Sequence, residues 1–169
     1  AEQNRLIPGK LFCLHPDSRV QVLQWESGGP VERLVAEHDG YERLSHPVRH
    51  RREVFVDRLN ETWQVTDRLT ARDDRSLSHH VEWTLPFAPQ CSLLPARTGW
   101  YIVTPFQRLW FEGPWVSSRD KTINPLPHLD EGLVAPQYGR TQRAPVLRWR
   151  WEGVLPVECR FSVSRAGNE

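Results

Sequence analysis

Methionine is absent from this sequence of 169 residues, and so are long apolar runs and any large excess of charge of one sign. With 22 lysine and arginine residues against 21 aspartate and glutamate, the net charge of +1 provides no global field for nucleic acid or an anionic membrane. No run approaches the roughly 18 apolar residues of a membrane span, and residues 1–10 lack a signal-peptide pattern. We therefore expect no nucleic-acid partner, no membrane partner, and a mature or excised chain.

Cysteine is also scarce, and Cys13, Cys91 and Cys159 are far apart with no C-x-x-C arrangement. This pattern argues against a zinc ribbon and against a disulfide-dense scaffold, because both need closely spaced cysteines. Cys159 alternates with apolar Val157 and Phe161, which predicts a buried core thiol. No close histidine or cysteine spacing indicates a metal site, so we expect neither a metal nor a cofactor.

Helical periodicity is missing as well, whereas several short windows alternate apolar and polar residues. In Thr62–Leu69, alternation places four side chains on one face of a strand: Trp63, Val65, Asp67 and Leu69. Asp67 is the polar exception on that face. Since Asn60-Glu61 is a turn dipeptide that follows another apolar run, residues 51–69 are predicted to form a β-hairpin.

The other expected strands are separated by many of the 14 prolines and 10 glycines; they are Leu11–Leu14, Val20–Glu26, Val31–Glu37, His79–Leu85, Trp100–Thr104, Leu109–Glu112, Pro145–Trp151 and Val157–Ser164. About ten strands approach the upper limit of one open sheet. We therefore predict an all-β chain in which residues 1–169 form a single antiparallel β-sandwich domain of about ten strands. The longest gap, Ser117–Gln142, is expected to be a loop.

Several motifs occur in an order that is similar to the C-terminal domain of the heparinase II/III-like family. The resemblance covers roughly residues 34–163 and depends on six segments: Ala36–Leu44 with its H-x-G-Y pattern, Pro47–Arg52 with His-Arg-Arg, Trp63–Asp67, Ser78–Trp83, Tyr138-Gly139 and Leu155-Pro156. Each segment alone is a weak signal. Their succession is what makes the resemblance specific.

The resemblance implies a bacterial polysaccharide lyase in which an N-terminal α/α toroid precedes β-sandwich layers. Such enzymes cleave uronate-containing acidic glycans by β-elimination, so an acidic polysaccharide and the toroid are the implied partners, and a periplasmic or secreted location is expected. The family's H-x-H-x-D segment, which supplies a catalytic histidine and metal ligands, is missing here. The adjacent pair His79-His80 cannot replace it. We therefore assign no catalytic residue to this chain and expect it to be inactive alone.

Elimination from a uronate requires neutralisation of the carboxylate, a base and an acid, and His, Tyr and Arg suit these roles. His38 and Tyr41 flank a turn dipeptide, so both are candidates to contact sugar from one loop tip; the alternative is a loop whose tyrosine packs inward. Arg51 is predicted to point opposite to its neighbours and is a candidate to bind a carboxylate with two hydrogen bonds. The favoured alternative is a structural pair between Arg51 and Asp67.

Three further candidates for substrate binding lie on later strands. His80 shares its strand face with polar residues that either line a groove or form a solvated outer face. Arg148 and Arg150 alternate with Trp149 and Trp151, which predicts arginines on one face and tryptophans on the other. The sequence thus favours a lyase module that forms one wall of a substrate cleft, and the alternative is a free-standing carbohydrate-binding module.

Overall fold

The computed structural model describes residues 4–10, 13–73, 76–119 and 121–167, and within these ranges it contains twelve strands and no helix. The strands are β1 (Val20–Glu26), β2 (Val31–Tyr41), β3 (Val48–Asp57), β4 (Thr62–Ala71), β5 (Ser78–Pro86), β6 (Ser92–Pro95), β7 (Gly99–Val103), β8 (Arg108–Ser118), β9 (Lys121–Ile123), β10 (His128–Gln137), β11 (Arg140–Val154) and β12 (Val157–Arg165). The described part of the chain therefore holds no helix that could cross a membrane.

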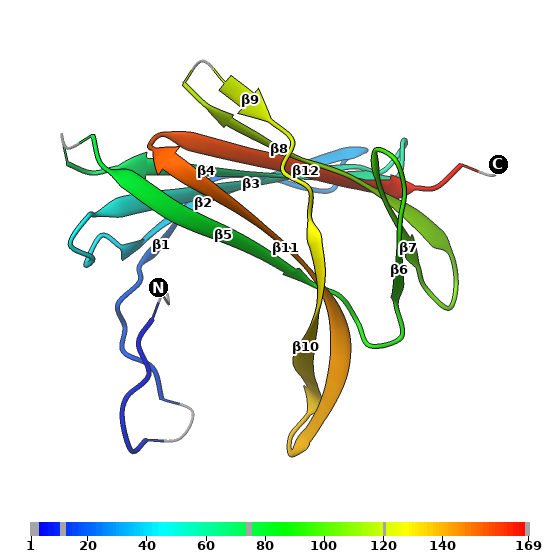
Figure 1. The fold of residues 1–169 in the computed structure, drawn as a ribbon, viewed down its shortest axis with the longest axis horizontal. Coiled ribbons are helices and arrows are strands. Elements are labelled where there is room, and N and C mark those ends of the chain that lie inside the picture. The colour runs from blue at the N-terminus through cyan, green and yellow to red at the C-terminus, as the bar shows by residue number, and fades with distance from the viewer. Residues whose placement is uncertain (1–3, 11–12, 74–75, 120, 168–169) are drawn as a thin grey trace.

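Two antiparallel sheets form the fold (Figure 1). Within the described ranges, the larger sheet has nine strands in the order β1-β2-β3-β4-β12-β8-β7-β6, with β9 paired to β8, and the smaller has three in the order β10-β11-β5. This arrangement confirms the predicted all-β, sandwich-like fold. The prediction of a loop over Ser117–Gln142 was wrong, because this region contains β9 and β10. The exposed edge strand β10 has little apolar alternation, so its partner β11 specifies it more than its own sequence does.

The core lies where the two sheets face each other. Trp149 of β11 packs against Phe111 of β8 and Phe161 of β12, with ring centroids 6.3 and 5.7 Å apart, and it stacks on Trp83 of β5 at 6.4 Å. Trp151 is also buried. The predicted division of β11 into a tryptophan face and an arginine face is therefore confirmed.

The hairpin β3–β4 forms as the sequence predicts. Asp57 accepts backbone hydrogen bonds from Leu59 and Asn60, at 3.0 Å each, which stabilises the turn before β4. The register places Arg52 opposite Asp67, and Val54 opposite Val65. Because opposite residues share a face, the inward face of this hairpin is apolar except for one polar row.

The expected first strand and the cysteines have mixed outcomes. In Leu11–Leu14, residues 11 and 12 lie outside the described ranges, and Leu14 forms only an isolated β-bridge with Leu6. Cys159 is fully buried, as predicted, and its Sγ accepts a hydrogen bond from Trp149 Nε1 at 3.3 Å. It is a free thiol.

Candidate functional site

A row of polar side chains crosses the inward face of the larger sheet from β2 to β4. His38 Nε2 lies 2.9 Å from His50 Nδ1, and His50 Nε2 lies 2.8 Å from Asp67 Oδ1. Arg52 donates from Nε to Asp67 Oδ1 at 2.6 Å and from Nη2 to Oδ2 at 2.8 Å. We call His38, His50, Arg52 and Asp67 the polar row. Its carboxylate is fully buried and accepts three hydrogen bonds.

The backbone sets the direction of the hydrogen bonds in the polar row. Gly40 N–H donates to His38 Nδ1 at 3.2 Å, so a neutral His38 carries its proton on Nε2. That proton is then donated to His50 Nδ1, which leaves the His50 proton on Nε2 for Asp67. A second proton on His38 would place two donors face to face at Gly40. The hydrogen bonds thus select one neutral tautomer of each ring.

The pKa shifts of His38 and Asp67 agree with the protonation states that the hydrogen bonds select. Burial lowers the pKa of His38, and the neighbouring His50 lowers it further. Burial acts to raise the pKa of Asp67, but the hydrogen bonds from Arg52 and His50 outweigh it and hold the pKa below its usual range. At neutral pH these shifts favour the carboxylate form of Asp67 and the uncharged ring of His38.

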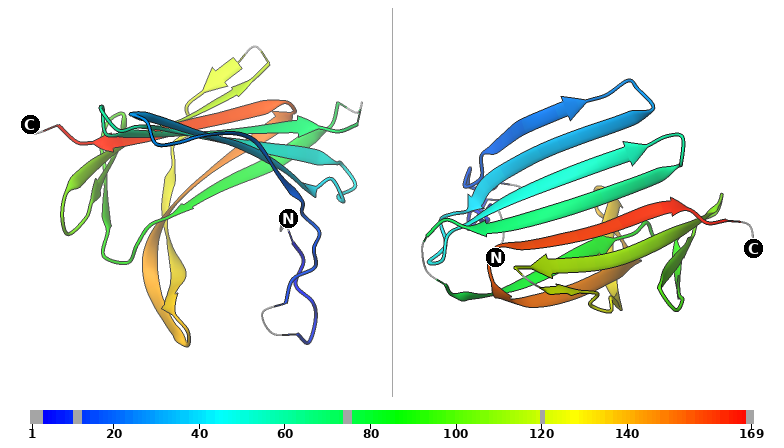
Figure 2. Two further views of the ribbon diagram at one scale, coloured as in Figure 1. Left: turned by 180° about the vertical axis from the view of Figure 1, so that it is seen from behind. Right: turned by 90° about the horizontal axis from the view of Figure 1, so that it is seen from above.

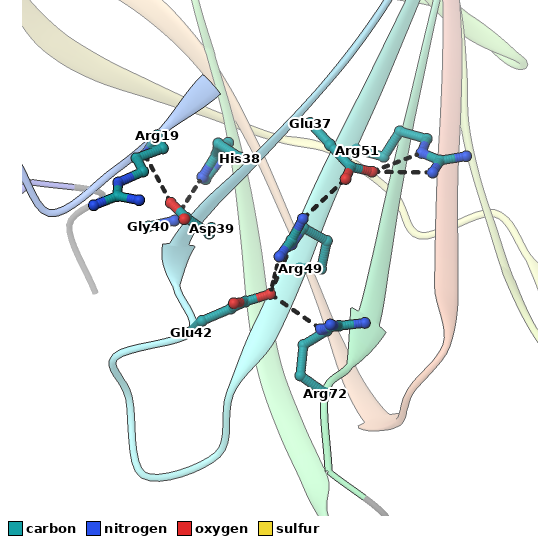
Figure 3. Close-up of polar contacts among 9 residues, drawn as sticks. All are labelled: Arg19, Glu37, His38, Asp39, Gly40, Glu42, Arg49, Arg51 and Arg72. Carbon is teal, nitrogen blue, oxygen red and sulfur yellow. Dashed lines mark hydrogen bonds and ion pairs between the residues drawn. The ribbon is translucent and has the colours of Figure 1, made fainter. Parts of the chain in front are cut away.

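The prediction that His38 and Tyr41 project from a loop tip was wrong. Both belong to β2, which passes through Asp39-Gly40 with an irregular register instead of turning there. Asp39 Oδ1 accepts a hydrogen bond from the backbone N–H of Arg19 at 2.7 Å, which ties this irregular segment to the start of β1 (Figure 3). His38 is consequently buried, and its ring meets that of Tyr41 edge-on at 5.2 Å.

The expected pair between Arg51 and Asp67 was also wrong. Arg51 does point opposite to its neighbours, as predicted, but Asp67 is on the inward face and pairs with Arg52 instead. Arg51 lies on the outward face, where its Nη2 is 3.0 Å from Glu37 Oε2. Figure 3 shows how the ion pairs continue there, from Glu37 through Arg49 and Glu42 to Arg72, at distances of 2.9, 2.6 and 3.1 Å.

The remaining predicted contacts gather on the outward face of the smaller sheet. His80 and Arg150 have highly exposed side chains, 80% and 81%, while Arg148 is partly covered. Glu82 links the arginines, because Arg150 Nε lies 2.6 Å from its Oε2 and Arg148 Nη1 lies 3.3 Å from its Oε1. His80 approaches Glu152 at 3.4 Å. A hollow of about 640 Å³ opens beside His80, Glu82 and Arg150.

A larger cleft of about 1020 Å³ separates the two sheets next to the core. One wall is the inward face of β3 and β4, including His50, Arg52 and Asp67, and the opposite wall is β5 with His79 and Trp83. The structure therefore divides the six predicted residues among three surfaces. Tyr41 lines the cleft, and buried His38 contacts the cleft-lining His50. Arg51 belongs to the outward face of the larger sheet, and the other three to the smaller sheet.

Sequence reasoning missed His50 and Arg52 as partners of Asp67. The available signal was the alternation itself, because a carboxylate on an apolar face requires a cation on the same face of the neighbouring strand. Within the described ranges, no group of three or more His, Cys, Asp or Glu side chains is arranged to hold a metal ion.

This fold and site define an all-β protein in which a row of paired polar side chains, with the carboxylate of Asp67 fully buried, lies on the inward face of the larger sheet. The family model described as "Heparinase II/III-like, C-terminal" matches residues 9–155, and the chain belongs to this family. No curated protein matches its sequence at a significant level.

Solved structures share the fold at low sequence identity. The heparan sulfate lyase HepC from Pedobacter heparinus is 13% identical with a TM-score of 0.69, and the match covers 89% of this chain and 22% of that one. Heparinase III, the BT4657 gene product, is 14% identical with a TM-score of 0.60, and the match covers 87% of this chain and 21% of that one. The chain therefore spans about a fifth of the length of these enzymes.

Proposed function

We propose that this chain is the C-terminal β-domain of a polysaccharide lyase that cleaves uronate-containing acidic glycans by β-elimination. In this proposal an N-terminal α/α toroid and the β-domain enclose the substrate, and the chain supplies one wall of the cleft. The observation that carries the proposal is the family match over residues 9–155. A periplasmic or secreted location is part of the same proposal.

The residues of this chain would bind and orient the glycan rather than perform the elimination. His80 and Arg150 are the most accessible of the proposed contacts, and Arg148 lies between them and Asp130 on β10. Guanidinium groups suit the carboxylates and sulfates of acidic glycans because they donate two parallel hydrogen bonds. Tyr41 and Arg51 remain proposed contacts at the other sheet. His38 is buried, so it would affect the glycan only indirectly, through its contacts with Tyr41 and His50.

The test compares this chain with the longer polypeptide that contains it. Each is incubated with heparan sulfate, and the unsaturated uronate product is followed by its ultraviolet absorbance. We expect product from the longer polypeptide and none from this chain. Product from this chain alone would refute the accessory role. Retention of this chain on immobilised heparan sulfate, with no product from either polypeptide, would favour the free-standing carbohydrate-binding module.

A pair of variants tests the proposed contact surface. Arg150→Gln in the longer polypeptide should raise KM for heparan sulfate several-fold with little change in kcat, since uniform binding is lost. Arg58→Gln is the matched control, because Arg58 is also an exposed arginine with one carboxylate partner, Glu32, but belongs to the larger sheet. Equal increases in KM for the two variants would exclude Arg150 as a contact for the glycan.

A further inference from the structure

The outward face of the larger sheet has two different halves. Over β2 and β3 its charged side chains are joined in ion pairs, such as Arg51 with Glu37. On β12, Cys159 and Phe161 are buried against Trp149 of the smaller sheet, so Arg160 between them points outward. Figure 2 (right) looks onto this outward face, with β12 and β8 lying over β5 and β11.

Two tryptophans lie on the half of the outward face that β8 and β12 form. Trp115 is opposite Arg160 of β12, and Trp110 is opposite Ser164. Because these β12 residues are four positions apart, the two indole rings are separated by roughly 13 Å along the strand. Both rings are half-buried, although no other strand of the described ranges pairs over them. A single extended ligand of a few linked rings can therefore contact both.

Glycines allow both indole rings to lie against the backbone. A Cβ at Gly113 would be 3.0 Å from Trp115 Cε3, and a Cβ at Gly99 would be 2.7 Å from Trp110 Cζ2, so a larger residue at either position would push the ring away. Tyr101 holds Trp110 further through an edge-on contact, with ring centroids 4.9 Å apart. Rings fixed in this way lose little rotamer freedom when a ligand stacks on them.

The polar groups around the two tryptophans are not used within the protein. Gln64 of β4 is opposite Ser162, which is opposite Glu112, so these three form a row between the two rings. Within the described ranges, none of the three makes a hydrogen bond or ion pair through its side chain, and neither do Thr66, Arg160, Ser164 and the indole N–H groups of Trp110 and Trp115. The Arg160 guanidinium lies only at the margin of the Trp115 ring, 5.7 Å from its centroid. We call Trp110, Trp115, Gln64, Glu112, Arg160 and Ser162 the outward platform.

The chemistry of the outward platform favours a sugar chain over a protein or a strong anion. The axial C–H groups of a pyranose form a flat apolar surface that matches an indole ring, and its hydroxyl groups both donate and accept hydrogen bonds. A protein interface would desolvate Arg160 and Glu112 without a fixed partner, which is costly. Arg68 and Arg160 are balanced by Glu112 and Glu158, so the surface has no net field to attract a highly sulfated chain.

We propose that the outward platform is a glycan-binding site that takes a weakly charged stretch of polysaccharide, rich in free hydroxyl groups. Sugar rings stack on Trp110 and Trp115, and Gln64, Glu112 and Ser162 bind hydroxyl groups between them. The site is separate from the surface of Arg148 and Arg150, which lies on the other sheet. The inference rests on the proposed function only in taking a glycan as the ligand.

Isothermal titration calorimetry of this chain with hexasaccharides from chemically desulfated heparan sulfate tests the proposal. We expect binding whose Kd changes less than about threefold between low salt and about 0.5 M salt, since charge contributes little. Absence of binding would overturn the proposal, and so would binding of sulfated hexasaccharides alone with strong salt dependence. Either outcome would leave the lyase assignment intact. Binding as expected, with no lyase activity in the longer polypeptide, would refute only the proposed function.

Tryptophan variants locate the binding on the outward platform. Trp115→Ala should raise the Kd at least about fivefold, and Trp115→Phe, which keeps a stacking ring, should restore most of the affinity. Trp25→Ala is the matched control, because Trp25 is 67% exposed but shares the inward face with Leu34 and should leave the Kd unchanged. Equal effects of Trp115→Ala and Trp25→Ala would overturn the proposal.

Two further measurements guard against misfolding and self-association. Arg160→Gln changes an exposed side chain, so the fold should persist, as read by an unchanged Tm, while the Kd rises about two- to threefold. An unchanged Kd for this variant, together with loss of folding in Trp115→Ala, would count against the site. Sedimentation velocity should show a monomer. A dimer that Trp115→Phe dissociates would assign this face to a second copy of the chain and overturn the proposal.

Discussion

Replacement of Asp67 by asparagine tests whether the polar row is a structural ion pair. The carboxylate is fully buried and accepts two hydrogen bonds from Arg52 and one from His50. Asparagine keeps the volume but replaces one acceptor oxygen with an NH2 group, which then faces a donor. The substitution therefore opens no cavity, and the decrease in the free energy of unfolding reports on hydrogen bonding and charge alone.

The magnitude follows from the two partners. Removal of one member of a buried ion pair costs roughly 3–5 kcal/mol, and a buried donor without an acceptor costs roughly 1–3 kcal/mol. The Arg52 side chain is 52% exposed, so water can solvate part of its charge, which reduces the loss. We expect a loss of about 3 kcal/mol in the free energy of unfolding. At this chain length that corresponds to a fall in Tm of roughly 6–12 °C.

Urea denaturation of wild type, Asp67→Asn and a control, Asp130→Asn, measures this loss. Asp130 also accepts a hydrogen bond from an arginine, Arg148, at 3.0 Å, but it lies on the exposed edge strand β10, so its loss should remain within about 0.5 kcal/mol. Arg52→Met should cost at least as much as Asp67→Asn, because it leaves the buried carboxylate charged with only His50 as partner. Similar midpoints for the Asp67 and Asp130 variants would refute the reasoning.

Three further predictions follow from the pKa shifts and the exposed surface. The pKa of His38 is lowered in the folded state, so its contribution to stability is present above the unfolded pKa of 6.5 and is lost as pH falls through the folded pKa. His38→Gln should therefore weaken the dependence of the urea midpoint on pH between about pH 8 and pH 5. Parallel curves of midpoint against pH for the variant and wild type would contradict this. Burial raises the pKa of Cys159 to about 12, so iodoacetamide should label exposed Cys13 in the native chain and leave Cys159 unmodified, as read by mass spectrometry. Arg150→Gln should elute earlier than wild type or Arg58→Gln when the longer polypeptide is eluted from heparan sulfate with salt, and unchanged elution would exclude Arg150 as a contact.

Alternation predicted the hairpin and the inward side chains because each strand there has one apolar face. It also identifies Asp67 as an exception, but the predicted pair with Arg51 was wrong because Arg51 and Asp67 lie on opposite faces of the sheet, and Arg52 is the arginine opposite Asp67. The passage of β2 through Asp39-Gly40 was not predictable from turn preference alone. Pairing with β3 and the hydrogen bond from Arg19 to Asp39 override that preference locally. Edge strand β10 was missed because its partner specifies it.

The charge balance of the outward face of the smaller sheet predicts that this chain alone binds an acidic glycan only weakly there. Arg150 is already hydrogen-bonded to Glu82, whose pKa is lowered first by that bond. His80 lies near Glu152 in the same way. A uronate or sulfate would have to displace these carboxylates, and the gain in Coulomb energy at exposed sites is small. A second protein surface could strengthen glycan binding in two ways: it could contribute unpaired cations, or it could exclude water from the arginine face and so strengthen each charge interaction. The opposite wall of an enclosed cleft would do both.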